Sequence, residues 1–281
     1  MARTGFGRSS GRQDSVCTHP NGTTFTPALR RSLAQRQDVA EVWALGSVQH
    51  GDAGISNARK SDPMPSALPI ISGRFRKAYA LGHSSGGCAR VLAASHYPDL
   101  FTAVAPVHAV IAPPELDRAI SRPPAWVAHN GLVSTAHPLL RTWDRNVLDV
   151  YVKQALVEEE AGGKVRLKCD KIDEAAVYAE ARASWEAWGA LPLLDERVSL
   201  LVVQTREFAT ARVRRRAVTN AHVVIPNGTH LAVQTHPRQI AEAVQVFLQP
   251  VDGSGPGYAC ELKLPKIEAA MFGQRGPRAH L

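Results

Sequence analysis

The segment YALGHSSGGCARVLAAS, residues 79–95, contains a Gly-x-Ser-x-Gly pattern formed by Gly82, Ser84 and Gly86. At average glycine and serine usage this pattern arises by chance in roughly 0.1 of chains of this length, so it identifies nothing by itself. Its context is more specific, because apolar residues typical of a strand precede it and residues typical of a helix follow it. A strand, a sharp turn and a helix form the setting that exposes a nucleophilic serine.

The residue types in this turn fit such a site. Ser84 would lie in a strained turn with its Oγ above the sheet, and Gly82 and Gly86 would omit side chains where strand and helix approach closely. The N–H of Ser85, at the helix start, would point toward an oxyanion that develops on a substrate. We expect Ser84 to be the nucleophile and Ser85 an oxyanion donor; the alternative is a glycine-rich connection without chemistry.

A serine nucleophile needs a base, and His230 is the best-placed of the histidines. It follows the last expected strand and precedes the last expected helix, at the carboxyl edge of a parallel sheet, where chemistry gathers. His236 is a competitor but is expected to begin the final helix. His83 adjoins Ser84, although the turn would direct its side chain elsewhere, and His222 is expected to begin a strand.

The acid that orients this histidine should follow the strand before it. Glu207 is the candidate, because no Asp lies between Asp195 and His230. Glu207 is equally compatible with a surface charge paired with Arg206 or Arg212.

A second oxyanion donor is expected in the loop after the short strand at residues 15–19. The loop contains Pro20, Asn21 and Gly22. Proline has no N–H, so Asn21 or Gly22 would have to donate.

The order of expected strands and helices indicates an α/β fold. Strands alternate with helices, which predicts a mostly parallel sheet with helices on both faces and one helical insertion. We expect five segments: a disordered basic N-terminus at residues 1–14, a core at 15–112 and 198–249, a helical cap at 113–197, and a tail at 250–281.

Charge and composition exclude several classes of function. The net charge of +8 includes a cluster at Arg212 and residues 214–216, but no aromatic residues interleave it, so we expect a solvated helix face and no nucleic-acid partner. No apolar stretch is long enough for a membrane span. The cysteines lack metal-ligand spacing, so we expect no metal; nor do we expect an organic cofactor.

These motifs together resemble the α/β-hydrolase superfamily, whose chain order of serine, acid and histidine they share. More narrowly, the chain resembles fungal hydrolases of host-selective toxin clusters, of the AK-toxin and ACT-toxin type, and the related yeast peroxisomal lipase. The segments that carry this resemblance are THPNGTTF, VWALGSVQHGDAGISN, ALGHSSGG followed by HYPDLF, and VVQTRE…IPNGTHL…HPRQIAEAV. They span roughly residues 15–249.

The resemblance implies a serine hydrolase with a helical cap that acts in secondary metabolism, often in peroxisomes. The last residues, Ala279, His280 and Leu281, resemble a variant of the C-terminal tripeptide that the peroxisomal import receptor binds. A cytoplasmic location is the alternative. The family has further strands before the THPNG region, so we expect N-terminal strands to be missing from the sheet.

The sequence therefore predicts a serine esterase or thioesterase acting on a small-molecule acyl substrate. Two alternatives stay open: a non-catalytic binding protein with the same fold, and an acyltransferase that uses the same triad.

Overall fold

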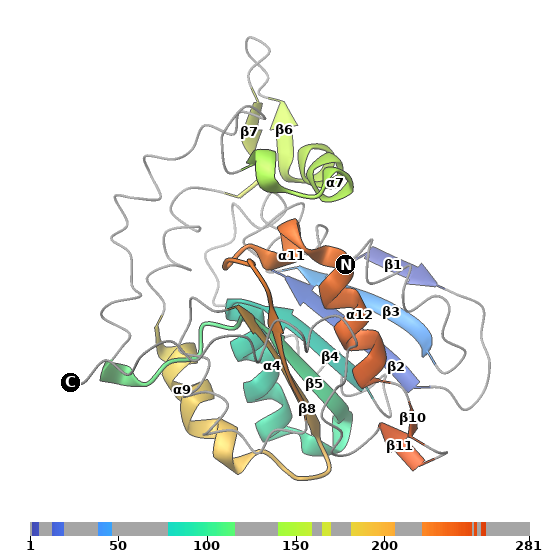
Figure 1. Cartoon of the computed structure of the whole chain (residues 1–281), viewed down its shortest axis with the longest axis vertical. Coiled ribbons are helices and arrows are strands. Elements are labelled where there is room, and N and C mark those ends of the chain that lie inside the picture. The colour runs from blue at the N-terminus through green and yellow to red at the C-terminus, as the bar shows by residue number, and fades with distance from the viewer. Residues whose placement is uncertain are drawn as a thin grey trace, which may run out of the picture.

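The main element of the molecule is a seven-stranded sheet (Figure 1). The computed structural model describes residues 2–5, 13–19, 39–46, 78–115, 140–158, 165–169, 181–205, 221–248, 250–251 and 254–256. Within them the sheet order is β1-β3-β2-β4-β5-β8-β9. Its strands are β1 (Ala2–Gly5), β2 (Gln13–His19), β3 (Val39–Gly46), β4 (Ala78–His83), β5 (Phe101–Val107), β8 (Ser199–Thr205) and β9 (Ala221–Ile225).

The sheet is mainly parallel, as the alternation of elements predicts. All neighbours from β3 to β9 pair in parallel, whereas β1 pairs with β3 in the antiparallel sense. Strands β4, β5, β8 and β9 therefore end at the same edge, with His83 beside Val107 and Val107 beside Val203. The residues that follow these strands are brought together there.

The basic N-terminus differs from the expectation of disorder over residues 1–14. Ala2–Gly5 forms β1, and β2 already begins at Gln13. One further strand therefore precedes β2: β1 pairs with β3 along four residues. The segment ARTG has no apolar alternation, so its sequence gives no strand signal, and its pairing comes from backbone groups at an open sheet edge.

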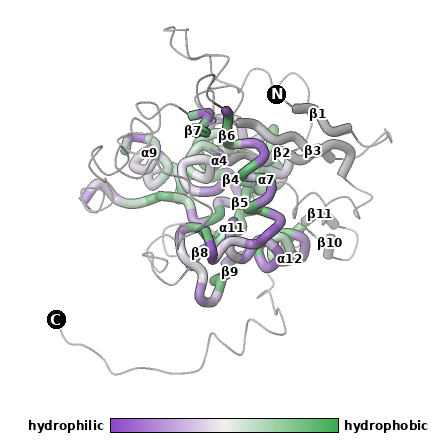
Figure 2. Tube along the Cα trace, turned by 90° about the horizontal axis from the view of Figure 1, so that it is seen from above, coloured by the Kyte–Doolittle hydropathy of each residue, from purple (hydrophilic) through white to green (hydrophobic). Residues whose placement is uncertain are grey.

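Helices cover both faces of the central strands. Successive residues of a strand point to opposite sides, so these apolar strands present side chains that must be buried on each face. One core lies under α4 (Ser85–His96) and α9 (Arg182–Ala190), and the other under α12 (Pro237–Phe247). Figure 2 shows α9 and α12 on opposite sides of these strands. Leu200 and Leu201, neighbours in β8, have no exposed surface and belong to different cores. Burial of each contributes about 1.5–3 kcal/mol.

Helix α9 falls within the cap that the sequence predicts at residues 113–197, and it packs against the sheet. Ala187 and Ala190, with Leu191 and Leu194 after the helix, belong to the same buried core as α4. Figure 1 shows α9 beside α4. An apolar stripe at helical spacing predicts a buried face but not which layer buries it, so the pattern fits either location.

Above the carboxyl edge lie α7 (Arg145–Ala155), β6 (Leu156–Glu158) and β7 (Val165–Leu167), with α11 (Ala232–Thr235) between them and the sheet (Figure 1). Helix α7 ends at Ala155, and β6, which follows it directly, pairs with β7 as an antiparallel hairpin. The N–H of Asp144 donates to the carbonyl of Gln234 at 2.8 Å. This bond joins the start of α7 to α11, close to His230.

The remaining described elements are short: η1 (Pro98–Leu100), η2 (Leu140–Thr142), η3 (Leu191–Leu193), and a hairpin of β10 (Pro250–Val251) and β11 (Ser254–Pro256). None of the described helices is long and apolar enough to cross a membrane.

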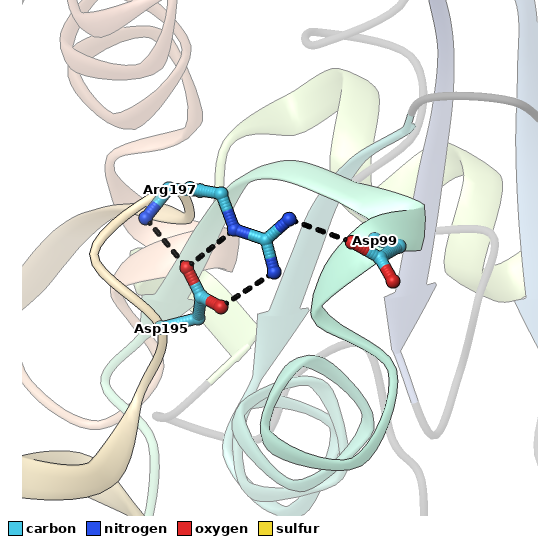
Figure 3. A network of polar contacts seen from close by, with 3 residues as sticks. All are labelled: Asp99, Asp195 and Arg197. Carbon is cyan, nitrogen blue, oxygen red and sulfur yellow. Dashed lines mark hydrogen bonds and ion pairs between the residues drawn. The ribbon is translucent and has the colours of Figure 1, made fainter.

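An exposed ion-pair network joins η1 to the turn before β8 (Figure 3). The Arg197 guanidinium contacts Asp195 at 2.7 Å and Asp99 at 2.8 Å. Hydrogen bonds from the Arg197 side chain and backbone lower the pKa of Asp195 to about 2. The hydrogen bonds and opposite charges of Asp195 and then Asp99 raise the pKa of Arg197 above its ordinary value.

Candidate active site

Ser84 forms the sharp turn between β4 and α4 that the sequence predicts. Its φ of 56° and ψ of −125° lie in a region that residues other than glycine rarely adopt. Such a conformation costs about 1–3 kcal/mol, and strain of this kind is concentrated at functional sites. The N–H of Ser84 donates to the carbonyl of Val107 at 3.2 Å, which ties the turn to the end of β5. The side chain of Ser84 is half-buried.

The glycines around Ser84 allow the strand and the helix to approach closely. A Cβ at Gly82 would lie 2.2 Å from the carbonyl oxygen of Gly86, so the role expected for Gly82 is confirmed. A Cβ at Gly87 would lie 2.5 Å from the Cβ of Ala109, so a further glycine is needed where α4 passes the segment after β5.

His230 contacts Ser84, as the rule for parallel strands predicts. It follows β9 by a tight turn that includes Asn227 at φ 56°, and its Nε2 lies 3.0 Å from the Oγ of Ser84. This distance allows the hydroxyl of Ser84 to donate its proton to His230.

His83 has a contact that the sequence does not predict. Its side chain was expected to point away from the site, but its Nε2–H donates to the backbone carbonyl of His230 at 2.7 Å. The two imidazole centroids are 4.9 Å apart, and His83 is buried. His83 therefore holds the segment that carries His230. The expectation is wrong because His83, the last residue of β4, meets the loop that follows β9 at the same sheet edge.

The other ring nitrogen of His230 meets a third histidine. The Nδ1 of His230 lies 2.9 Å from the Nδ1 of His108, and the Nε2 of His108 lies 2.7 Å from the Oγ1 of Thr205. His108 is the first residue after β5 and Thr205 the last residue of β8; they are 2% and 0% exposed. A continuous line of polar contacts thus runs from Ser84 through two imidazoles to Thr205.

The two competing histidines lie elsewhere. His236 immediately precedes α12, as expected, and its Nδ1 contacts the Oγ1 of Thr235 at 2.7 Å. His222 is the second residue of β9 rather than its first. Neither is joined to Ser84 by a recorded hydrogen bond.

Ser85 is the first residue of α4, so the helix leaves its N–H without an intrahelical partner and available for an oxyanion. The other predicted site residues lie outside the described residues: Glu207, Asn21, Gly22, Ala279, His280 and Leu281.

His108 and Thr205 are not among the residues that the sequence predicts for the site. His108 directly follows β5, which ends at Val107, and its φ is 43°. One sequence signal could have indicated His108: a polar residue that directly follows an apolar parallel strand lies at the sheet edge where ligands bind.

Within the described part of the chain, no group of three or more His, Cys, Asp or Glu side chains is arranged to hold a metal ion. The arrangement can instead transfer a proton between a serine hydroxyl and an imidazole beside a helix N-terminus.

Solved structures with similar folds include hydrolases. A peroxisomal alpha-beta-hydrolase from Saccharomyces cerevisiae is 15% identical with a TM-score of 0.66 over 93% of this chain and 83% of its own. A thioesterase domain from the curacin biosynthetic pathway is 13% identical with a TM-score of 0.59 over 87% and 98%. An esterase from M. tuberculosis is 14% identical with a TM-score of 0.58 over 87% and 90%.

A search of curated protein sequences finds no match. The sequence pattern that defines the alpha/beta hydrolase family matches residues 2–243, which is most of the chain. This match agrees with the observed sheet order and with the serine turn between β4 and α4. The chain therefore belongs to the alpha/beta hydrolase family.

Proposed function

We propose that the protein is a serine hydrolase that cleaves an ester or thioester bond of a small acyl substrate. The observation that carries this proposal is the 3.0 Å contact between the Ser84 Oγ and the His230 Nε2 at a strained turn. An unactivated serine is a poor nucleophile, and a hydrogen-bonded imidazole is the usual means of activating it.

The reaction follows from these positions. The Ser84 Oγ attacks the acyl carbonyl while its proton moves to the His230 Nε2, and the N–H of Ser85 donates to the oxyanion. His230 then returns the proton to the departing alcohol or thiol, which leaves an acyl-serine. Water then attacks the acyl carbonyl while His230 takes its proton, and His230 returns that proton to the Ser84 Oγ as the acyl–Oγ bond breaks and the acid leaves. Asn21 or Gly22 is the proposed second oxyanion donor. Glu207, two residues beyond Thr205, is the acid that the sequence proposes for orienting His230, and it competes for this role with His108, which contacts the His230 Nδ1.

The strained turn adds to this support. Ser84 keeps a backbone conformation that costs free energy, and the contacts around it hold the Oγ toward His230. A purely structural connection between β4 and α4 would gain nothing from that conformation.

Labelling with a tagged fluorophosphonate tests the proposed nucleophile. We expect wild type to be labelled and Ser84→Ala to lose at least about 100-fold in labelling rate, because the probe reacts with activated serines. Equal labelling of both proteins would refute the enzymatic proposal and favour a binding protein. Product analysis with and without an alcohol or amine acceptor separates hydrolysis from acyl transfer.

For the cellular role, we propose secondary-metabolite biosynthesis of the fungal host-selective toxin type, in the peroxisome. The support is the sequence resemblance described above, with Ala279, His280 and Leu281 as the residues that the import receptor would bind. A fluorescent protein that ends in GPRAHL should become punctate in cells. A diffuse signal would contradict the peroxisomal proposal.

A further inference from the structure

His108 occupies the position from which the orientation of His230 is controlled. A catalytic imidazole presents one nitrogen to the nucleophile, and the partner of its other nitrogen fixes its tautomer and orientation. Here the His230 Nε2 contacts Ser84 and its Nδ1 contacts the His108 Nδ1 at 2.9 Å. We infer that His108, held by Thr205, is the positioning residue that makes His230 a competent base. This inference rests on the proposed function.

Counting protons along this line of contacts leaves two arrangements for neutral imidazoles. In the first, Ser84 donates to the His230 Nε2, the Nδ1–H of His230 donates to His108, and the Nε2–H of His108 donates to the Oγ1 of Thr205. In the second, every bond is reversed: Thr205 donates to His108, His108 to His230, and His230 to the serine oxygen. Only the first lets Ser84 give up its proton.

The tautomer of His108 therefore decides whether Ser84 is activated. A proton on the His108 Nε2 leaves its Nδ1 as an acceptor and so requires the proton of His230 to be on Nδ1. The Thr205 Oγ1, 2.7 Å from the His108 Nε2, can accept a hydrogen bond from that N–H. His108 acts through His230 and does not touch the reacting atoms, which makes it a positioning residue.

The surroundings of His108 hold the ring in place. Its backbone N–H donates to the carbonyl of Val203 at 2.6 Å, and its side chain is 2% exposed. Its φ of 43° lies in the left-handed region, where histidine is found more often than most residues. The His230 ring meets two other imidazoles: the His108 Nδ1 lies 2.9 Å from its Nδ1, and the His83 ring centroid lies 4.9 Å from its own.

Substitutions at His108 can separate its two nitrogens. In His108→Asn the Oδ1 takes the place of Nδ1, so the contact to His230 survives and the contact to Thr205 is lost. In His108→Gln the amide reaches the place of Nε2, so the contact to Thr205 survives and the contact to His230 is lost. Asparagine can orient a catalytic histidine, as in papain-like proteases.

The experiment measures the rate at which a tagged fluorophosphonate modifies each folded variant, with Ser84→Ala as the blank. We expect His108→Gln to slow modification at least about 100-fold and His108→Asn to stay within about 10-fold of wild type. Equal rates for His108→Gln and wild type, or equal losses for Asn and Gln, would overturn the inference. An unlabelled wild type would instead refute the proposed function.

A pH profile adds a result that a merely structural role would not produce. His108→Asp places a carboxylate against the Nδ1 of His230, which should move the acid limb of the modification rate up by about 1–3 pH units relative to His108→Asn. Coincident profiles for Asp and Asn would contradict the contact.

Glutamine tolerates a positive φ poorly, so thermal unfolding of each His108 variant is measured first.

Substitutions at Thr205 provide a second pair of variants. Thr205→Val removes the oxygen near the His108 Nε2 and should slow modification about 10-fold or more, whereas Thr205→Ser keeps it and should react as wild type. A Thr205→Val variant with the wild-type rate overturns the inference even where His108→Gln fails to fold. Glu207→Gln should slow fluorophosphonate modification less than His108→Gln does. A larger loss of rate for Glu207→Gln would assign the orienting role to Glu207 instead of His108.

Discussion

Replacing Gly82 with alanine would test the close approach of β4 and α4 on which the serine turn depends. The new Cβ would lie 2.2 Å from the carbonyl oxygen of Gly86 and 2.7 Å from the backbone nitrogen of Gly87. These separations are roughly 1 Å inside ordinary nonbonded contact. Backbone atoms cannot rotate aside as a flexible side chain can, so α4 must move away from β4. We expect a loss of about 3 kcal/mol in the free energy of unfolding.

Gly189 provides the matched control, because nothing lies within 4 Å of a Cβ built at that position in α9. Gly189→Ala should therefore stabilise the protein by about 0.5–1 kcal/mol through helix propensity. Urea unfolding followed by circular dichroism measures both variants. A Gly82→Ala variant within about 0.5 kcal/mol of wild type would show that the strand and helix are not packed as described.

Two further predictions concern polar contacts away from the turn. Asp144 accepts hydrogen bonds from the N–H groups of Asn146 and Val147 at the start of α7, so Asp144→Ala should cost about 1 kcal/mol in urea unfolding, and an unchanged midpoint would refute the cap. The hydrogen bonds from Arg197 lower the pKa of Asp195 to about 2, so the stability that they give is present above pH ~4 and is lost as the pH falls toward 2. Asp195→Asn should therefore melt below wild type at neutral pH, with a gap that narrows between pH ~4 and ~2; a constant gap would contradict this assignment.

Local signals and the rule for parallel strands predict the centre of the site. The apolar strand, the glycines and the following helix locate Ser84 from residues within one short segment. His230 is 146 residues away, yet its place after a late parallel strand predicts that it reaches the same sheet edge.

The surroundings of that pair are less predictable, because they depend on long-range packing. His108 and His230 are 122 residues apart, and nothing local in HAV or GTH indicates that the two rings meet. The same limit explains why the sequence does not place α9, whose apolar face fits either the cap or the core. It also explains why the sequence does not predict β1, a segment poor in apolar residues whose backbone pairs with the edge of the sheet.

The central claim is that His230 activates Ser84, and mapping the fluorophosphonate adduct by mass spectrometry tests it most directly. We expect one adduct per chain, on the peptide that contains Ser84, and we expect His230→Gln to slow its formation at least about 100-fold while the protein stays folded. An adduct on another residue, or an adduct on Ser84 that forms equally fast without His230, would contradict the claim.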